Sequence, residues 1–347
     1  MITALDFEKP VFELDKKITE LKNLSADGSL NLDSEVKKLE ARLLHLKKET
    51  YLHLTPWQRV QIARHPKRPY TLDYIQKIFS DFVEFHGDRT FADDKALVGG
   101  FAKLDGQSFL VMGHQKGRDA KENIMRNFGS AHPEGYRKAL RFMRMAEKFG
   151  TPIIAFVDTP GAYPGVGAEE RGQAYTIAVN IRDMARVQVP ILVFVIGEGG
   201  SGGALGIGVG DRVMVLENAY YSVISPEGCA VILWKDRTKA PEAAAALKLT
   251  AKDLLELGLI DEVIKEPLGG AHHDADTTAE TVKTAIKKHC KEIIDLSPEK
   301  LIKARYEKFR SMGVFEEKII SRLVPTGSAK REKKVHEKRI SNSKQSV

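Results

Sequence analysis

Two stretches near the N-terminus repeat apolar residues at spacings of three and four, the period of an α-helix with one buried face. The turn-forming segment Ser25-Ala26-Asp27-Gly28 separates them. The apolar positions are Leu14, Ile18 and Leu21, then Leu32, Val36, Leu39, Leu43 and Leu46. This pattern predicts a helical hairpin with one apolar seam. Two interpretations stay open: the seam is the hairpin's own core, or it is a docking surface for another chain.

The next segment, residues 55–85, contains three prolines and is typical of a connector. It should end in a helix that begins at Thr71, whose hydroxyl would cap the first free amides. From Ala96 onward, two short apolar runs flank Asp105-Gly106, a dipeptide favoured in type I′ turns. A β-hairpin is therefore expected to open the main domain.

Apolar runs and helical patterns then alternate along the chain, which indicates parallel βαβ units. The expected elements are a helix over 134–149, a strand over 152–157, a helix over 168–188, a strand over 190–196, a glycine-rich turn into a short helix, strands within 212–224, helices over 226–234, 239–247 and 250–257, a strand over 260–264, and helices over 277–296 and 298–311.

These patterns divide the chain of 347 residues into four parts. The predicted parts are the helical hairpin with its connector (1–85), an α/β core (86–268), C-terminal helices (269–316) and a basic tail that we expect to be disordered (317–347).

The composition, with 42% hydrophobic residues, is that of a globular enzyme with a substantial core. The N-terminus lacks the layout of a secretory signal, and no apolar run reaches the roughly 20 residues that span a bilayer. We therefore expect a cytoplasmic protein without a membrane partner. Its two cysteines, Cys229 and Cys290, are too few for a four-thiolate zinc site and should be plain buried or half-buried thiols.

The formal net charge of +7 is concentrated near the C-terminus. Residues 324–347 contain seven Lys or Arg and two Glu, a net charge of +5, which leaves +2 for all other residues. The core also has no stripe of alternating aromatic and basic residues of the kind that grips single strands. We do not expect nucleic acid to be a partner of the catalytic domain.

The densest chemical signal is a run of eight glycines within residues 197–210, directly after a predicted buried strand. So much glycine favours a backbone that bends tightly or approaches another group closely. If a helix begins near Gly202, the amides of Gly202 and Gly203 lie in its first turn without intrahelical acceptors, and the helix dipole adds partial positive charge there. Such amides suit an oxyanion.

Three other interpretations of the glycine run are possible. A phosphate-binding P-loop would need a Lys followed by Ser or Thr, which is missing. Residues 199–203 also fit the G-x-S-x-G elbow of serine hydrolases, with Ser201 as nucleophile, but none of the later histidines follows a strand as that fold requires. Close packing of a helix on a strand is the interpretation we prefer for Gly206, Gly208 and Gly210.

A second loop, residues 158–173, also follows a predicted strand and leads into a helix. Loops at the carboxyl ends of parallel strands meet at one crevice, which is where we place the site. Arg171 in this loop has a planar guanidinium suited to a carboxylate or a carbonyl. The alternative is that Glu169 and Glu170 neutralise Arg171 on the surface.

A basic cluster, Gly113-His114-Gln115-Lys116-Gly117-Arg118, follows the predicted β-hairpin. It could bind an anionic partner, or it could be solvated surface. The residues alone favour neither interpretation.

Residues from about Arg64 to Asp261 closely resemble the alpha-subunit family of bacterial acetyl-coenzyme A carboxylase carboxyltransferases. The flanking hairpin and EPLGGAHHD also resemble that family. The motifs that carry the resemblance are RHPKRPYTLDYI, DRTFADDKA, GHQKGR, FVDTPGAYPGVGAEERGQA, VIGEGGSGGALGIGVGD and SVISPEGCAVILWK. The basic extension from about Glu317 departs from the usual family length; it is either solvated, which we prefer, or in contact with an acidic partner.

The resemblance implies a crotonase-like α/β fold, a spiral of ββα units with an N-terminal helical hairpin. It implies a carboxyl transferase that is active only with a beta subunit, in an alpha2beta2 assembly, and that takes part in fatty acid biosynthesis. The implied substrates are acetyl-CoA and carboxybiotin on a biotin carboxyl carrier protein, which biotin carboxylase serves. The implied zinc ribbon belongs to the beta subunit, so no metal is expected on this chain.

The resemblance also implies the roles of the site residues. The amides of Gly202 and Gly203 would face the biotin ureido oxygen, and a matching pair on the beta subunit would face the thioester enolate. Arg171 would polarise the transferred carboxylate or carbonyl. The substrate-binding wall would be completed by Gly165, Gly167, Gly199 and Gly200.

Overall fold

The structure, a computed structural model, describes residues 5–26 and 32–314. The contacts group the chain up to Gly313 into one compact unit. The divisions placed at residues 85 and 268 from the sequence stay predictions, and the predicted basic tail lies outside the described residues.

A single eight-stranded sheet organises this unit, in the order β1-β2-β3-β4-β5-β6-β8, with β7 paired to the end of β5. The strands β1 to β3 pair antiparallel, and every later pairing is parallel, as the alternation of strands and helices predicted. The strands are β1 (Ser80–Glu84), β2 (Leu97–Leu104), β3 (Gln107–His114), β4 (Ile153–Thr159), β5 (Ile191–Gly200), β6 (Arg212–Leu216), β7 (Tyr220–Ser222) and β8 (Glu262–Ile264).

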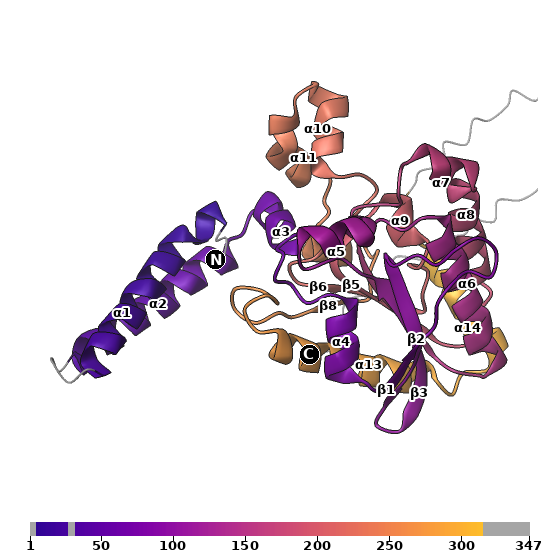
Figure 1. Cartoon of the computed structure of the whole chain (residues 1–347), viewed down its shortest axis with the longest axis horizontal. Coiled ribbons are helices and arrows are strands. Elements are labelled where there is room, and N and C mark those ends of the chain that lie inside the picture. The colour runs from indigo at the N-terminus through magenta and orange to yellow at the C-terminus, as the bar shows by residue number, and fades with distance from the viewer. Residues whose placement is uncertain (1–4, 27–31, 315–347) are drawn as a thin grey trace, which may run out of the picture. The chain divides into compact units, whose positions relative to one another are not determined.

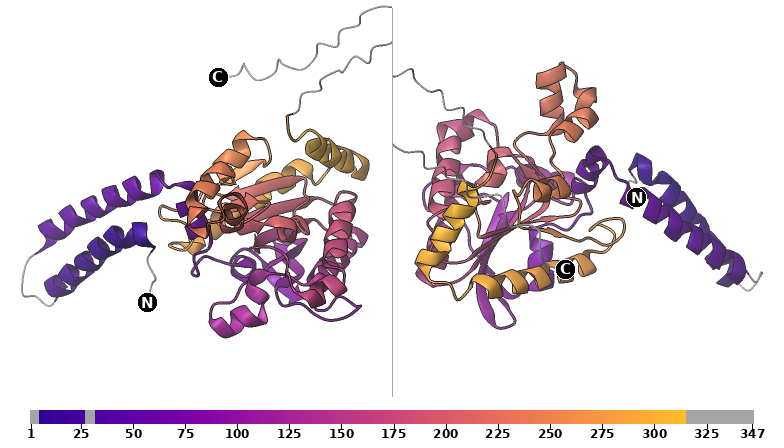
Figure 2. Two further views of the ribbon diagram at one scale, coloured as in Figure 1. Left: turned by 90° about the horizontal axis from the view of Figure 1, so that it is seen from above. Right: turned by 180° about the vertical axis from the view of Figure 1, so that it is seen from behind.

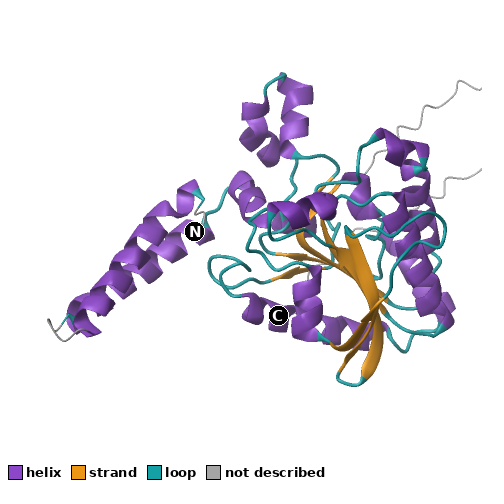
Figure 3. Ribbon diagram, in the orientation of Figure 1, coloured by secondary structure: helices purple, strands orange, loops and turns teal. Residues whose placement is uncertain are grey.

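Helices connect the strands and cover the sheet (Figures 1 and 3). The α-helices are α1 (Lys9–Ala26), α2 (Asp33–Leu52), α3 (Pro56–Ala63), α4 (Thr71–Ile78), α5 (Ala120–Met125), α6 (Pro133–Lys148), α7 (Val166–Glu170), α8 (Gln173–Met184), α9 (Ser201–Leu205), α10 (Pro226–Trp234), α11 (Ala240–Ala246), α12 (Ala251–Glu256), α13 (Ala275–Ile293) and α14 (Pro298–Arg310). Short 3-10 turns are η1 (Asp6–Glu8), η2 (Asn127–Gly129) and η3 (Arg237–Lys239).

The predicted helical hairpin is formed by α1 and α2, which run side by side in both views of Figure 2. The seam residues of both helices pack against each other in one apolar cluster, which confirms the interpretation that they form the hairpin's own core. Its further use as a docking surface stays a prediction.

The predicted β-hairpin is formed by β2 and β3, in continuous register from Leu97 opposite His114 to Leu104 opposite Gln107. Its two turn residues, Asp105 and Gly106, have φ angles of 50° and 84°. Type I′ turns require positive φ at both central positions, so the turn has the conformation that the sequence predicted.

Two local predictions were wrong. The helix expected over 168–188 is broken into α7 and α8, because Gly172 between them adopts a φ of 80°, which a continuing helix does not allow. Helix α4 begins at Thr71 as expected, but the Thr71 hydroxyl donates to the His114 carbonyl and does not cap the helix. The Asp73 carboxylate accepts from the Tyr70 amide instead.

The main core lies on both faces of the central strands. Every residue of β4 and β5 is buried, which explains why their sequences read as continuous apolar runs and not as alternating patterns. Both cysteines are buried and free, as expected. Among the described helices, none is long and apolar enough to cross a lipid bilayer.

Candidate active site

The two loops that follow β4 and β5 meet at the carboxyl ends of these neighbouring strands, as the sequence predicted. A methyl group on Gly200 would lie 2.2 Å from the carbonyl oxygen of Pro160, and one on Gly203 would lie 2.4 Å from the amide nitrogen of Ala162. Real Cβ atoms do not approach backbone atoms so closely. Glycine is therefore required at both positions for the loops to touch.

Strand β5 runs further than its apolar stretch, because it continues through the glycines to Gly200, where it pairs with β7. Helix α9 follows at once, and Ser201, Gly202 and Gly203 form its first turn. Its N-cap residue, Gly200, provides no side-chain cap, so no capping side chain competes for the free amides of this turn. With only five residues, α9 has a small dipole, and the amides themselves are the feature that suits an anion.

The two glycines of this turn differ in their surroundings. A methyl group on Gly202 would have as its nearest neighbour the Ile177 side chain at 3.7 Å, which is an ordinary contact, whereas Gly203 is packed against the other loop. A substitution at Gly202 can therefore test the site without moving the backbone, and one at Gly203 cannot.

The later glycines of the run have a packing role, as preferred from the sequence. Methyl groups would lie 2.5 Å from the Tyr136 ring at Gly206, 2.8 Å from the Ala204 carbonyl at Gly208 and 2.7 Å from a Val193 methyl at Gly210.

In the second loop, Gly165 is the N-cap of α7 and Arg171 is its C-cap. The Arg171 guanidinium pairs with Glu134, with Nε 2.6 Å from Oε1, and not with Glu169 or Glu170. The flat face of the guanidinium stacks on Phe91, with Arg171 Cζ 4.7 Å from the centre of the Phe91 ring.

Arg171 keeps one donor group free. Its Nη1, which would lie 3.0 Å from a methyl group on Gly167, donates to none of the described residues, and the side chain is 29% exposed. Glu134 therefore fixes the orientation of the guanidinium and leaves Nη1 available for a ligand.

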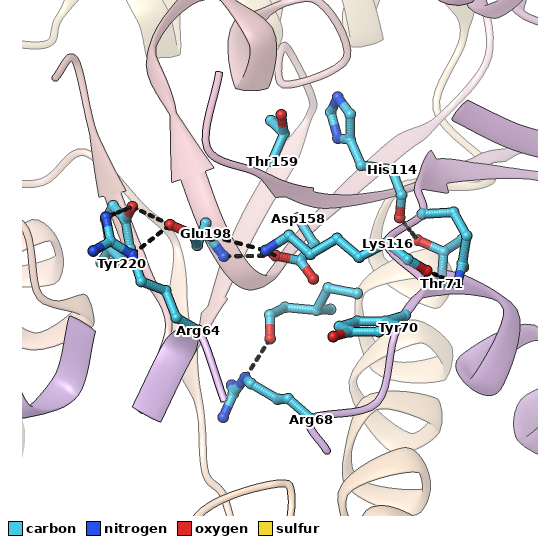
Figure 4. Close-up of polar contacts among 12 residues, drawn as sticks. Arg64, Arg68, Tyr70, Thr71, His114, Lys116, Asp158, Thr159, Glu198 and Tyr220 are labelled. Carbon is cyan, nitrogen blue, oxygen red and sulfur yellow. Dashed lines mark hydrogen bonds and ion pairs between the residues drawn. The ribbon is translucent and has the colours of Figure 1, made fainter. Parts of the chain in front are cut away.

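Behind the glycine loops lies a buried charge network that the sequence did not predict (Figure 4). Lys116 Nζ lies 2.7 Å from Asp158 Oδ1 and 2.9 Å from Glu198 Oε1. Asp158 is the next-to-last residue of β4, and Glu198 stands between Gly197 and Gly199 on β5. The Glu198 amide also donates to Asp158, so this network ties together the strand ends that present both loops.

The network extends to the connector through Arg64, whose Nε lies 2.7 Å from Glu198 Oε2. The Tyr220 hydroxyl donates to the same oxygen at 2.7 Å. Burial opposes the charge on Glu198, but Lys116 and Arg64 outweigh it and lower the pKa of Glu198 to about 2. Glu198 is therefore ionised at neutral pH and cannot act as a general base there.

These contacts decide how the basic cluster after the β-hairpin is used. His114 is fully buried, and burial together with Lys116 lowers its pKa to about 3, so it is neutral. Lys116 is occupied by two internal carboxylates. The interpretation as solvated surface is wrong for both residues, and Lys116 is not free to bind an external anion.

The serine-hydrolase interpretation fails on geometry. Ser201 is the first residue of α9, and the later histidines that could act as its base have other neighbours. His272 and His273 lie beside Glu8, and His289 pairs with the Glu262 carboxylate of β8. The fourth later histidine, in the tail, lies outside the described residues. No triad is assembled around Ser201 from the described part of the chain.

Replacing Ser201 with glycine tests this conclusion. Ser201 has a φ of 50°, which glycine adopts without strain, so Ser201→Gly removes the hydroxyl and keeps the backbone. We expect the turnover of the assembled enzyme to stay unchanged when it is measured by product formation. A loss of a thousandfold or more would instead restore Ser201 as a nucleophile.

Sequence reasoning missed Asp158, Glu198 and Glu134 as parts of the site. For Asp158 and Glu198, the available signal was an acidic residue near the end of a buried apolar strand, because a buried carboxylate requires a partner. The cationic partners Lys116, Arg64 and Arg171 are 37 to 134 residues away in the chain, and no periodicity shows them.

Residues 4–313 match the family model described as acetyl co-enzyme A carboxylase carboxyltransferase-like. The chain is 60% identical over 313 residues to a protein of Geobacter metallireducens named acetyl-coenzyme A carboxylase carboxyl transferase subunit alpha, covering 90% of this chain and 98% of that protein. A protein of the same name from Thermus thermophilus is 58% identical over 313 residues, covering 90% of this chain and 99% of its own length.

Solved structures with little sequence similarity share the fold. A Pseudomonas malonate decarboxylase hetero-tetramer, in complex with coenzyme A, gives a TM-score of 0.54 at 17% identity and covers 68% of this chain and 91% of that chain. Transcarboxylase 12S gives a TM-score of 0.52 at 22% identity. The aligned part covers 65% of this chain and 42% of the transcarboxylase chain.

These structural neighbours confirm the predicted crotonase-like α/β fold. The family match extends over the hairpin, the sheet and the C-terminal helices alike. The chain therefore belongs to the family of acetyl-coenzyme A carboxylase carboxyltransferase alpha subunits, which are carboxyl transferases.

Proposed function

We propose that this chain, together with a beta subunit, transfers a carboxyl group from carboxybiotin to acetyl-CoA and so forms malonyl-CoA, the first committed step of fatty acid biosynthesis. The observation that carries the proposal is the pair of first-turn amides at Gly202 and Gly203, next to a second glycine loop and without a nucleophile triad. Enolate chemistry of this kind needs oxyanion stabilisation more than it needs a side-chain base.

The residues at the glycine turn fit a biotin ureido oxygen. Carboxybiotin, as a substrate, supplies carbon dioxide and leaves negative charge on that oxygen, which can then accept a proton from the acetyl methyl group. The amides of Gly202 and Gly203 stabilise this charge as hydrogen-bond donors. Gly200 keeps the backbone close to the neighbouring loop at Pro160, and Gly199 keeps it close to Tyr220 and Tyr221 of β7.

Arg171 is proposed to hold the transferred carboxylate. Its free Nη1 can donate to a carboxylate oxygen, while the pair with Glu134 prevents the guanidinium from rotating away. Gly165 and Gly167 line this wall, and Gly167 leaves room beside the guanidinium.

The proposed assembly contains two alpha and two beta subunits. The substrate is delivered on a biotin carboxyl carrier protein that a biotin carboxylase has loaded. Two oxyanions form in the reaction, and residues 5–26 and 32–314 offer one first-turn glycine pair, which is why we assign the thioester enolate to the beta subunit. Since biotin arrives on another protein, no metal or resident cofactor is assigned to the reaction on this chain.

The test is malonyl-CoA production from carboxybiotin and acetyl-CoA by the full-length chain, with and without a co-expressed beta subunit. We expect activity only when both subunits are present, because each holds one oxyanion site. Activity of this chain alone, or its absence from a correctly assembled pair, would overturn the proposal of a shared site.

A further inference from the structure

A compact group of polar side chains lies where the N-terminal hairpin meets the rest of the unit, away from the glycine loops. Glu8 precedes α1, Tyr51 is near the end of α2, and His272 and His273 follow β8. The Tyr51 hydroxyl lies 2.8 Å from Glu8 Oε1 and 3.4 Å from His273 Nε2. The His65 ring stacks on the His272 ring, with the two ring centres 4.1 Å apart.

His272 is the anomalous member of this group. Its side chain is only 3% exposed, yet neither ring nitrogen makes a hydrogen bond with any described residue. The nearest carboxylate oxygen, Glu8 Oε1, is 3.7 Å from Nε2. A buried polar group without a partner costs free energy, so such a group in a folded protein calls for an explanation.

The chemistry of the neighbours supplies one. Glu8, His272 and His273 each offer one ligand atom, and these atoms all lie within 4.8 Å of one another. Two imidazoles and one carboxylate form a common zinc-binding set, which leaves a fourth position for a small ligand. We propose that Glu8, His272 and His273 bind a divalent transition-metal ion, zinc by this ligand chemistry, between the hairpin and the core.

The surrounding contacts prepare these ligands. Tyr51 donates to Glu8 Oε1, and the Leu5 amide donates to Oε2 at 3.0 Å, so both oxygens are oriented from outside the group.

Charged side chains surround the proposed site. A pocket of about 220 Å³ adjoins the two histidines and is lined by Asp15, Lys47 and Lys67 as well. Glu8 and Asp15 together balance a divalent ion. The two lysines favour an anion, such as hydroxide or chloride, at the fourth position.

Such an ion would act as a structural link. Glu8 and His272 are far apart in the chain, one before the hairpin and the other beyond the last strand of the sheet. Ligands from both sides would hold the hairpin on the core, so metal binding would be coupled to the stability of the whole unit.

The test uses the full-length chain without a tag and without the beta subunit, so that zinc on another subunit cannot contribute. The chain is treated with chelator, dialysed and titrated with Zn²⁺ by calorimetry, with Mg²⁺ as the comparison ion. We expect one Zn²⁺ per chain at micromolar affinity or tighter, a melting temperature raised by several degrees, and no response to Mg²⁺.

Two variants identify the ligands. Glu8→Gln and His273→Ala should each weaken Zn²⁺ binding at least about tenfold and abolish the rise in melting temperature. His86→Ala is the matched control, because His86 also lies within 4 Å of two carboxylates, on Asp93 and Glu84, but belongs to no such group. His273 is exposed, so its variant should fold.

Three results would overturn the inference. The first is no Zn²⁺ binding by the natural chain. The second is binding that both Glu8→Gln and His273→Ala leave unchanged. The third is binding that His86→Ala weakens as much as these two variants do.

Discussion

The Gly202→Pro variant should assemble normally and turn over about a hundred to a thousand times more slowly than the natural enzyme, the usual cost of losing one oxyanion donor. Proline removes the amide hydrogen and is tolerated in the first turn of a helix, where that hydrogen has no intrahelical acceptor. Gly202 lies in the first turn of α9, where a Cβ would contact only the Ile177 side chain, at 3.7 Å. The measurement is kcat for malonyl-CoA formation by the complex with the beta subunit.

Gly202→Ala is the matched control for this variant. Its methyl group would meet only Ile177 at 3.7 Å, and its amide hydrogen is kept, so we expect activity close to that of the natural enzyme. Melting temperature and assembly with the beta subunit show whether each variant folds. If both variants lost activity equally, or if Gly202→Pro remained fully active, the Gly202 amide would have no role in the reaction.

Replacing Lys116 with methionine should have the largest effect on stability, a loss of about 3–5 kcal/mol in the free energy of unfolding. The Lys116 side chain is 11% exposed and is the shared partner of Asp158 and Glu198, whose side chains are 2% and 8% exposed. Without it, Asp158 loses the ammonium that neutralises its charge, and Glu198 retains Arg64 as a cation and the Tyr220 hydroxyl as a donor. Because the network ties the two strand ends together, activity should fall as well. Denaturant unfolding of the purified chain measures the stability loss.

Two further variants make this prediction specific. Lys103→Met breaks an exposed pair with Asp81 and should cost less than about 1 kcal/mol. Adding Asp158→Asn to Lys116→Met should recover part of the loss, because the amide oxygen can still accept from the Glu198 amide while one buried charge disappears. A loss no greater than that of Lys103→Met, or no recovery in the double variant, would show that the network is not the cause.

Much of the fold followed from local patterns. The three-and-four spacing in the first 46 residues predicted α1 and α2, and Asp105-Gly106 predicted the turn between β2 and β3. Apolar runs located β4 and β5 because both strands are buried on both faces. Each of these features is short-range and depends on residues that are close in the chain.

The same local reasoning failed where a distant group competed. The Thr71 hydroxyl binds the His114 carbonyl 43 residues away, so it does not serve as a cap. Arg171 pairs with Glu134 and not with its immediate neighbours. A side chain takes the partner that the fold brings nearest, and sequence distance does not predict that partner.

By itself, the sequence determined which family this chain belongs to, where most strands and helices of its core lie, and which glycines surround the proposed site, because short motifs and hydrophobic periods are written in neighbouring residues. Only the tertiary structure decided that Gly202 has space while Gly203 has none, that Lys116 is buried between two carboxylates, and that Glu8 meets His272. These properties depend on contacts between residues that are far apart in the chain, and the energy of burying a charge or a polar group is set by the partners that folding supplies.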